Sequence, residues 1–187
     1  MRLSFLYLFI VSLIACNSEP VFTEVKTEVK EVVLNPATID KTKTSIYISK
    51  SKYQLSLLQE GKVLKTWKVV LGRNPVDDKL RQGDRCTPEG TFKVRDLYPH
   101  RSWSKFIWID YPNEMSRLKH AKAKANGTID KDASIGGEVG IHGVPPDQDY
   151  WIDEGDNWTY GCVSLKNSDV DELYQYIQVG TPIVIEK

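Results

Sequence analysis

The stretch WTYGCVSL, Trp158 to Leu165, places a cysteine directly after a glycine in an aromatic and β-branched run. Upstream, His142 lies in the stretch GIHG, and sixteen residues (143–158) separate it from Thr159. Glycines let the backbone turn sharply, so GEVGIHG predicts a short strand that ends in a bend and presents an imidazole. An imidazole near a thiol lowers the thiol pKa and accepts its proton. Cys162 is therefore a candidate nucleophile, with His142 as its base.

Composition alone leaves other interpretations of Cys162 open. Cysteine is among the residue types most often buried, so Cys162 could be a core residue, and His142 could equally be structural. A disulfide between Cys86 and Cys162 is a further alternative. The cysteines and histidines are widely spaced and form no C-x-x-C or H-E-x-x-H pair, so we expect no metal site.

Length and charge limit the class of protein. The chain has 187 residues, enough for one domain with an extension, and its hydrophobic content of 41% with 27% charged residues is that of a globular protein. Basic and acidic residues both number 25, so there is no net field to attract nucleic acid. We expect no nucleic-acid partner, and partners must be inferred from individual sites.

The first fifteen residues, MRLSFLYLFIVSLIA, predict a signal peptide. Arg2 precedes an apolar run from Leu3 to Ile14 that is too short to span a bilayer. The run ends in LIAC, which resembles a bacterial lipobox and implies that Cys16 is lipidated. The alternative is a plain signal peptide with an incidental cysteine. We expect a lipoprotein of the bacterial periplasm, attached to a membrane through Cys16.

Residues 16–43 predict a flexible tether after the lipidated cysteine. They repeat TEVK, alternate charges of both signs and contain two prolines, although EVKTEVKEVV also fits an alternating strand. The folded domain is expected over residues 44–187.

The domain itself predicts a mainly β, β-rich α+β fold with one or two short helices. SIYIS, YQLSLL and TPIVIE read as short strands. NSDVDELYQYIQVG predicts an amphipathic helix capped by Asn167 or Ser168 and ended by Gly180, with apolar residues at helical spacing. NEMSRLKHAKAKANG fits either a helix or a basic loop.

Taken together, three blocks resemble the L,D-transpeptidase (YkuD-type) catalytic domain family. IHG, a gap and then Thr159-Tyr160-Gly161-Cys162 is similar to the family pattern of His, a loop and [Ser/Thr]-x-Gly-Cys. GRNPVDDKLRQGDRCTPEGTFKV resembles the family's G…P…K…GD..TPEG block, and DYPN precedes GIHGVP as in the family. The resemblance covers most of residues 45–187 and implies a β-sandwich of short mixed strands.

The resemblance implies a role for each residue that matches the motif. Cys162 would be the nucleophile, His142 its general base, and the Gly143 carbonyl the third catalytic member. The oxyanion hole would be made by the backbone N–H groups of Tyr160, Gly161 and Cys162. Substrate contacts are expected from Trp158, Thr159 and Asp156.

The implied activity is a two-step acyl transfer on peptidoglycan stem tetrapeptides, through a thioester, by a monomer that needs no cofactor. Transfer to water instead, as in an L,D-carboxypeptidase or a hydrolase of a cross-link or protein–wall amide, is one alternative. A non-catalytic wall-binding lipoprotein is another. The chain departs from the family at Tyr160, where many members have His or Arg, at Ser164, where many have Arg, and at Cys86.

The loop between His142 and Cys162 is acidic, with Asp147, Asp149, Asp153, Glu154 and Asp156. It fits either a lid that attracts an ammonium group or an ordinary solvated loop.

Overall fold

The computed structural model describes residues 34–187. The predicted signal peptide, the lipidated Cys16 and most of the predicted tether lie outside the described residues. Residues 34–43, which we assigned to the tether, instead form two 3₁₀ turns, η1 (Pro36–Thr38) and η2 (Lys41–Lys43). Leu34 and Ile39 pack against the hydrophobic core. Contacts with the core therefore reach back to Leu34, ahead of the expected start of the domain at Thr44.

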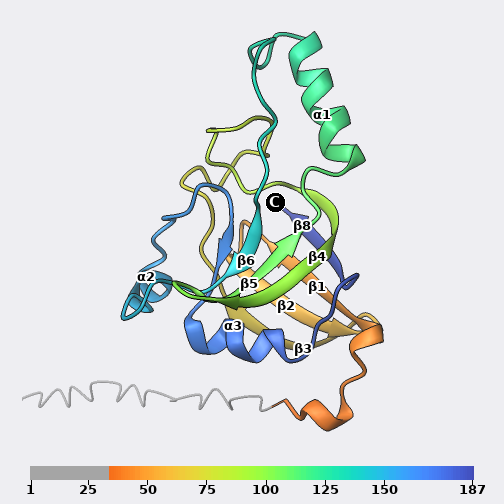
Figure 1. Ribbon diagram of the computed structural model, residues 1–187, viewed down its shortest axis with the longest axis vertical. Coiled ribbons are helices and arrows are strands. Elements are labelled where there is room, and N and C mark those ends of the chain that lie inside the picture. Colours follow the sequence, from red (N-terminus) through yellow and green to blue (C-terminus); the bar gives the residue numbers. More distant parts are fainter. Residues whose placement is uncertain (1–33) are drawn as a thin grey trace, which may run out of the picture. The chain divides into compact units, whose positions relative to one another are not determined.

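The described residues form one curled, mixed sheet of eight strands (Figure 1). The strands are β1 (Thr44–Ser49), β2 (Gln54–Gln59), β3 (Lys62–Lys68), β4 (Gly90–His100), β5 (Ser104–Ile109), β6 (Gly140–His142), β7 (Val163–Ser164) and β8 (Pro182–Glu186). Their order is β3-β2-β1-β8-β4-β5-β6-β7. Only the β1–β8 and β6–β7 pairs are parallel. The predicted β-rich class is confirmed.

Alternation along the strands builds one core. Ile46 and Ile48 of β1 are buried, as are Ile183 and Ile185 of the parallel neighbour β8. Side chains of a strand point alternately to its two faces, so each strand contributes every second residue to the interior. Each such fully buried aliphatic side chain stabilises the fold by roughly 1.5–3 kcal/mol.

The long strand β4 joins the two halves of the sheet. Its residues Gly90–Lys93 pair with β8, and its residues from Val94 onward pair with β5, with a register shift between Val94 and Asp96. A β-bulge bends a strand and increases its twist, which lets the sheet curl along β4. At the other edge, Val70 and Ser164 exchange two 2.9 Å backbone hydrogen bonds. The segment after β3 therefore meets β7, and the curled sheet nearly closes on itself.

Three α-helices occur within residues 34–187, against the one or two expected: α1 (Glu114–Ala125), α2 (Tyr150–Glu154) and α3 (Asn167–Tyr174). The segment that fitted either a helix or a loop is α1, whose first turn is capped by the Asn113 side chain (3.1 Å to the Ser116 N–H). The unexpected helix, α2, is too short for a periodic pattern to predict it. None of these helices is long and apolar enough to cross a membrane.

Helix α3 lies against the sheet and buries Val170 and Leu173, as the apolar stripe predicts. Its boundaries differ from the prediction. Lys166, and not Asn167 or Ser168, occupies the N-cap, and the helix ends at Tyr174, well before Gly180. Ile177 is still buried beyond the helix end, so the stripe reflects core contacts that continue past the last turn.

Candidate active site

The loop that carries Cys162 is held by the hydroxyl of Thr159. This hydroxyl accepts the Gly161 N–H (3.2 Å) and donates to the Cys162 carbonyl (2.7 Å). Thr159 is buried. The Thr159 side chain, which we expected to contact substrate, therefore shapes the loop, and the Gly161 N–H, which we expected in the oxyanion hole, is bonded to that hydroxyl.

Gly161 lies directly above the GDRCTPEG segment. Its φ is +136°, and a Cβ on Gly161 would lie 2.7 Å from the Cys86 carbonyl oxygen. Gly72 is equally confined, because a Cβ there would collide with the Arg85 carbonyl and lie 3.0 Å from the Cα of Gly161. The Thr87 hydroxyl accepts the Gly72 N–H at 3.0 Å. Backbone packing, and not side-chain contact, thus positions the cysteine loop.

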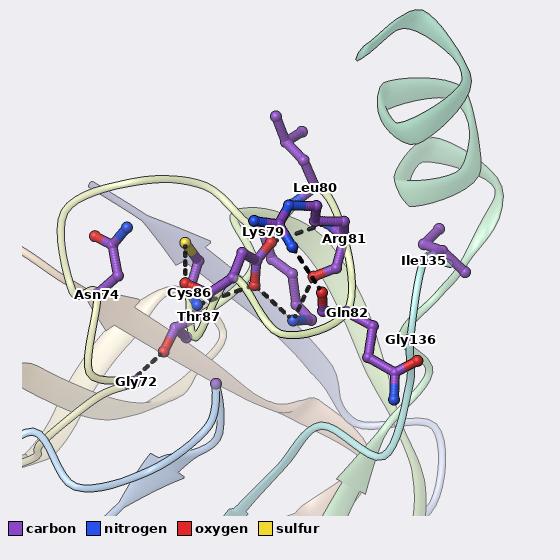
Figure 2. A network of polar contacts seen from close by, with 12 residues as sticks. Gly72, Asn74, Lys79, Leu80, Arg81, Gln82, Cys86, Thr87, Ile135 and Gly136 are labelled. Carbon is purple, nitrogen blue, oxygen red and sulfur yellow. Dashed lines mark hydrogen bonds and ion pairs between the residues drawn. The ribbon is translucent and has the colours of Figure 1, made fainter. Parts of the chain in front are cut away.

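A buried ion pair fixes the segment beneath Gly161. Figure 2 shows Lys79 within the loop, with its polar contacts dashed. Lys79 Nζ lies 2.8 Å from Asp84 Oδ1, which also accepts the Cys86 N–H (3.1 Å). The other Asp84 oxygen accepts the N–H groups of Leu80 and Arg81. Burial raises the pKa of Asp84, but these hydrogen bonds and Lys79 outweigh it and leave the pKa below its usual value.

Replacing Gly161 with alanine is expected to destabilise the domain and prevent reaction at Cys162. The substitution adds both a disfavoured φ and a clash with the Cys86 carbonyl. Gly61→Ala is the matched control, because Gly61 has φ +80° and nothing within 4 Å of a Cβ, so only the backbone strain of roughly 1–2 kcal/mol applies. Thermal unfolding should show a larger loss of Tm for Gly161→Ala. Equal losses would contradict the packing argument.

His142 ends β6, and its imidazole is buried among aromatic rings. Trp103 stacks on it with ring centres 4.4 Å apart, and Phe106 lies parallel at 5.7 Å. His142 Nδ1 is 2.7 Å from the Gly143 carbonyl oxygen, which also accepts the Ser164 hydroxyl at 3.1 Å. A carbonyl can only accept, so Nδ1 carries the proton and Nε2 keeps a free lone pair. The imidazole is thus oriented as a base through Nε2.

Gly143 is required at its position. A Cβ there would collide with Asn167 Oδ1 and lie 2.7 Å from the Trp103 carbonyl oxygen. The Gly143 N–H donates to that same Trp103 carbonyl (3.0 Å), and Asn167 Oδ1 accepts the Val144 N–H (3.2 Å). These contacts set the bend that turns the Gly143 carbonyl back toward the imidazole.

The register of the β6–β7 pair brings the two candidate side chains to one face. Ile141 pairs with Val163 and His142 with Ser164, and Cys162 immediately precedes β7. Paired residues of parallel strands share a face, as do residues two apart along a strand, so Cys162, Ser164 and His142 point to the same side. Cys162 is half-buried, and its Sγ lies 3.6 Å from the Glu138 carbonyl oxygen.

Burial keeps both groups neutral in the resting site. It raises the pKa of the Cys162 thiol to about 11, which the Gly140 N–H and the Lys79 charge oppose. It lowers the pKa of His142 to about 4, against the hydrogen bond to Gly143. Near pH 7 the site therefore holds a thiol and a neutral imidazole. A thiolate forms only if the proton moves to His142 Nε2.

Two cavities adjoin this site. One of about 280 Å³ opens on Cys162 and is otherwise walled by Glu138 and by a set of aromatic side chains: Tyr98, His100, Trp103, Phe106 and Trp108. The other, about 660 Å³, is lined by Tyr160, Glu138 and residues of the loops before β4 and β6, Lys79 among them. Glu138 belongs to both, so the cavities meet beside the thiol.

A profile of the L,D-transpeptidase catalytic domain, YkuD, matches residues 43–185. The chain belongs to this family. YafK of Escherichia coli (strain K12), named as a candidate L,D-transpeptidase, is 24% identical over 121 residues, which are 64% of this chain and 39% of YafK.

Solved structures show the same fold at low identity. The helical cell shape determining protein Pgp2 of Campylobacter jejuni aligns with a TM-score of 0.59 and 20% identity over 77% of this chain and 47% of its own. Bd1075 of Bdellovibrio bacteriovorus aligns with a TM-score of 0.54 and 18% identity over 77% of this chain and 48% of its own. The chain thus spans less than half the length of each of these relatives.

Two other residues expected to touch substrate lie elsewhere in this L,D-transpeptidase domain. Trp158 packs with Val70, Val144 and Ile152, and its ring edge meets the His142 imidazole at 5.5 Å, so it supports the base. Asp156 is exposed and lines neither cavity.

Tyr160, a departure from the family pattern, is 69% exposed. Two guanidinium groups lie near its ring, with Arg73 at 5.3 Å and Arg85 at 5.7 Å from the ring centre. The other departure, Ser164, is fully buried and bonds the Gly143 carbonyl. Ser164 therefore supports the imidazole. It does not reach the surface, where the arginine that many family members have at this position could contact a substrate.

Cys86 and Cys162 are both free, so the disulfide alternative is not formed in the structure. Within residues 34–187, no three His, Cys, Asp or Glu side chains gather as metal ligands would. The acidic loop is fastened to the domain, because Asp153 pairs with Lys166 (2.6 Å) and Asp149 accepts the Asn167 N–H (2.9 Å). Two of its five acids are therefore occupied away from the thiol.

Sequence reasoning missed Glu138 and the aromatic wall. Trp103 and Phe106 come from the turn before β5 and from β5 itself, and Phe106 reaches His142 because these two residues are paired across β5 and β6. The many aromatic residues in YPHRSWSKFIW were the sequence signal for an aromatic wall. Without knowledge of the β5–β6 pairing, nothing in the sequence connected them with His142.

Proposed function

We propose that the domain is a cysteine-dependent peptidoglycan L,D-transpeptidase, with Cys162 as nucleophile and His142 as general base. The observation that carries this proposal is the 2.7 Å contact between His142 Nδ1 and the Gly143 carbonyl, which leaves Nε2 as the basic atom on the face that holds Cys162. Family membership supports the reaction class.

In the first step, the Cys162 thiol gives its proton to His142 Nε2, and the sulfur attacks the carbonyl carbon of an L-centre that is followed by a D-residue. The C–N bond then breaks, and the proton leaves on the amine of D-alanine. A thioester remains on Cys162. Because both groups are neutral at rest, proton transfer and attack are coupled, and the charge appears only with substrate in place.

The oxyanion of this step needs preorganised donors. We assign the role to the N–H groups of Tyr160 and Cys162, which have no protein acceptor among the described residues. Gly161 is left out of the expected trio because its N–H is bonded to Thr159. Each remaining donor would contribute about 2.7–4 kcal/mol to stabilising the transition state.

In the second step, the side-chain amine of another stem peptide attacks the thioester and forms a 3→3 cross-link. We further propose that lipidation at Cys16 holds the domain at a membrane of the bacterial periplasm, where peptidoglycan lies within reach, and that it acts there as a monomer.

The test is to incubate the purified protein with tetrapeptide muropeptides and to identify the products by mass spectrometry. A thioester adduct on the protein and cross-linked dimers are expected. An adduct with tripeptides only would indicate a hydrolase or carboxypeptidase. Saturable binding to sacculi with no adduct, and none with a carbapenem, would contradict the enzymatic proposal and support a wall-binding lipoprotein.

A further inference from the structure

The wall of the 280 Å³ cavity is chemically uniform. Four of the seven residues that line it are Tyr, Trp or Phe, and a fifth is His100. Rings of this kind attract cations over their faces, and Trp does so most strongly. One of them already makes such a contact, since the Arg95 guanidinium lies 4.8 Å from the ring centre of Trp108. Trp103 stacks on both His100 and His142, so the wall offers apolar ring surface to an organic ligand and leaves its charge to be recognised by another group.

Among residues 34–187, Glu138 is the one carboxylate that borders this cavity. It is exposed, and within residues 34–187 its carboxylate makes no ion pair or hydrogen bond with another residue. Its backbone carbonyl is the group 3.6 Å from Cys162 Sγ, so the residue sits at the thiol. The charge of the Glu138 carboxylate acts on the thiol and contributes to the raised pKa of Cys162.

The acidic loop does not supply a competing charge at this position. Asp149 and Asp153 are bonded to Asn167 and Lys166, and no residue of that loop lines the cavity. Lys79 borders only the larger cavity, where its charge is paired with Asp84. Glu138 borders both cavities, so they differ in their other walls: one is aromatic, and the other carries the Lys79 ammonium that is paired with Asp84.

We propose that the aromatic cavity is the acceptor subsite, where a primary ammonium group binds between the Glu138 carboxylate and the rings, next to the thioester on Cys162. The inference rests on the proposed function and adds to it the place and chemistry of acceptor recognition. It also explains how an amine can compete with water, since an amine held there is presented at high local concentration.

The chemistry of this step balances without a further reagent. The bound ammonium gives one proton to His142 Nε2, which passes it to solvent. The freed amine attacks the thioester carbonyl carbon, a C–N bond forms and the C–S bond breaks. A second proton moves from the nitrogen through His142 to the Cys162 sulfur. The third proton remains on the new amide.

Glu138→Gln tests the proposal by separating cationic from neutral acceptors. With a stem tripeptide whose side-chain amine is free, the variant should show a roughly five- to tenfold higher KM for the acceptor and a product mixture shifted toward hydrolysis. With hydroxylamine, which is uncharged near pH 7, the rate of thioester cleavage should not change. Acylation by the donor should change less than transfer to the tripeptide, because the Glu138 charge is only one contribution to the raised pKa of Cys162. Glu154→Gln, an exposed acid of α2 that lines neither cavity, is the matched control.

A second readout does not depend on turnover. Two tryptophans line the cavity, so binding of the tripeptide to the unacylated protein should change the intrinsic fluorescence, and Glu138→Gln and Tyr98→Leu should both weaken that binding. A Glu138→Gln protein that loses acylation, hydroxylamine cleavage and tripeptide transfer to the same extent would overturn the proposal, as would unaltered tripeptide binding. A wild-type protein that binds the tripeptide but is never acylated would contradict the proposed function while supporting the subsite.

Discussion

A protein with Cys162 replaced by alanine is expected to form no covalent adduct with a tetrapeptide donor or a carbapenem, and to unfold at the same temperature as the wild type. The sulfur is the attacking atom of the proposed reaction, and losing a nucleophile costs on the order of 10⁴-fold or more in rate. Stability should be retained because Cys162 is half-buried and its thiol makes only a long, 3.6 Å contact with the Glu138 carbonyl oxygen. Intact-protein mass spectrometry and thermal unfolding measure the two effects.

Cys86→Ala is the matched control for this experiment. Cys86 is buried, and burial raises the pKa of its thiol to about 11, while Asp84 adds to the shift. Its sulfur donates to the Asp84 carbonyl at 3.4 Å and touches no cavity beside Cys162. The control should keep full adduct formation and lose stability by about 1 kcal/mol. An adduct that persists in Cys162→Ala and disappears in Cys86→Ala would show that Cys86, and not Cys162, is the nucleophile.

Replacing His142 with glutamine should lower the rate of adduct formation by roughly 10²–10⁴-fold and change its dependence on pH. In the wild type the rate should be level near neutrality and fall as the pH drops toward about 4, where the imidazole becomes protonated and no longer accepts the thiol proton. Without the imidazole, only thiolate that forms spontaneously can react. The variant's rate should therefore rise about tenfold per pH unit up to the high pKa of the thiol.

This profile is measured as the second-order rate of carbapenem adduct formation at each pH, with circular dichroism to verify that the protein stays folded. His120→Gln is the control, because its ring contacts the Leu80 carbonyl and lines neither cavity beside the thiol. It should keep the wild-type profile. A wild-type rate that itself rises tenfold per pH unit through neutrality would mean that His142 does not take the proton.

The strands were predictable wherever one face of the sheet is buried. In SIYIS and TPIVIE every second residue enters the core, and the alternation of apolar residues in the sequence predicts this. The two turns in residues 34–43 were not predicted, because 3₁₀ turns of three residues have no period and Leu34 and Ile39 stand as isolated apolar residues in a polar stretch. The early end of α3 was not predicted because the apolar pattern continues beyond the helix. Ile177 keeps the helical spacing although the helix ends at Tyr174.

Within the site, local sequence was a good guide to the backbone and a poor one to side-chain partners. The spacing of His142 and Cys162 led to both residues and to the Gly143 carbonyl that contacts the imidazole. It could not show that the Thr159 hydroxyl takes the Gly161 N–H, because a three-residue turn allows several hydrogen-bond patterns. Nor could it place Glu138, whose position follows from the pairing of strands far apart in sequence.

The parallel pairing of β6 and β7 has a consequence for how such a domain can diversify. Parallel neighbours require a crossover, and here residues 143–162 make it, with α2 inside. The β6–β7 pairing sets the spacing of the two reactive side chains, whatever the length of the crossover. It joins Ile141 to Val163 and His142 to Ser164. The excursion can therefore be shortened, lengthened or exchanged between relatives while the reactive pair keeps its geometry. The residues between Val144 and Trp158 line neither cavity beside the thiol, so exchanging them would change the outer face of the domain and leave the walls of both cavities as they are.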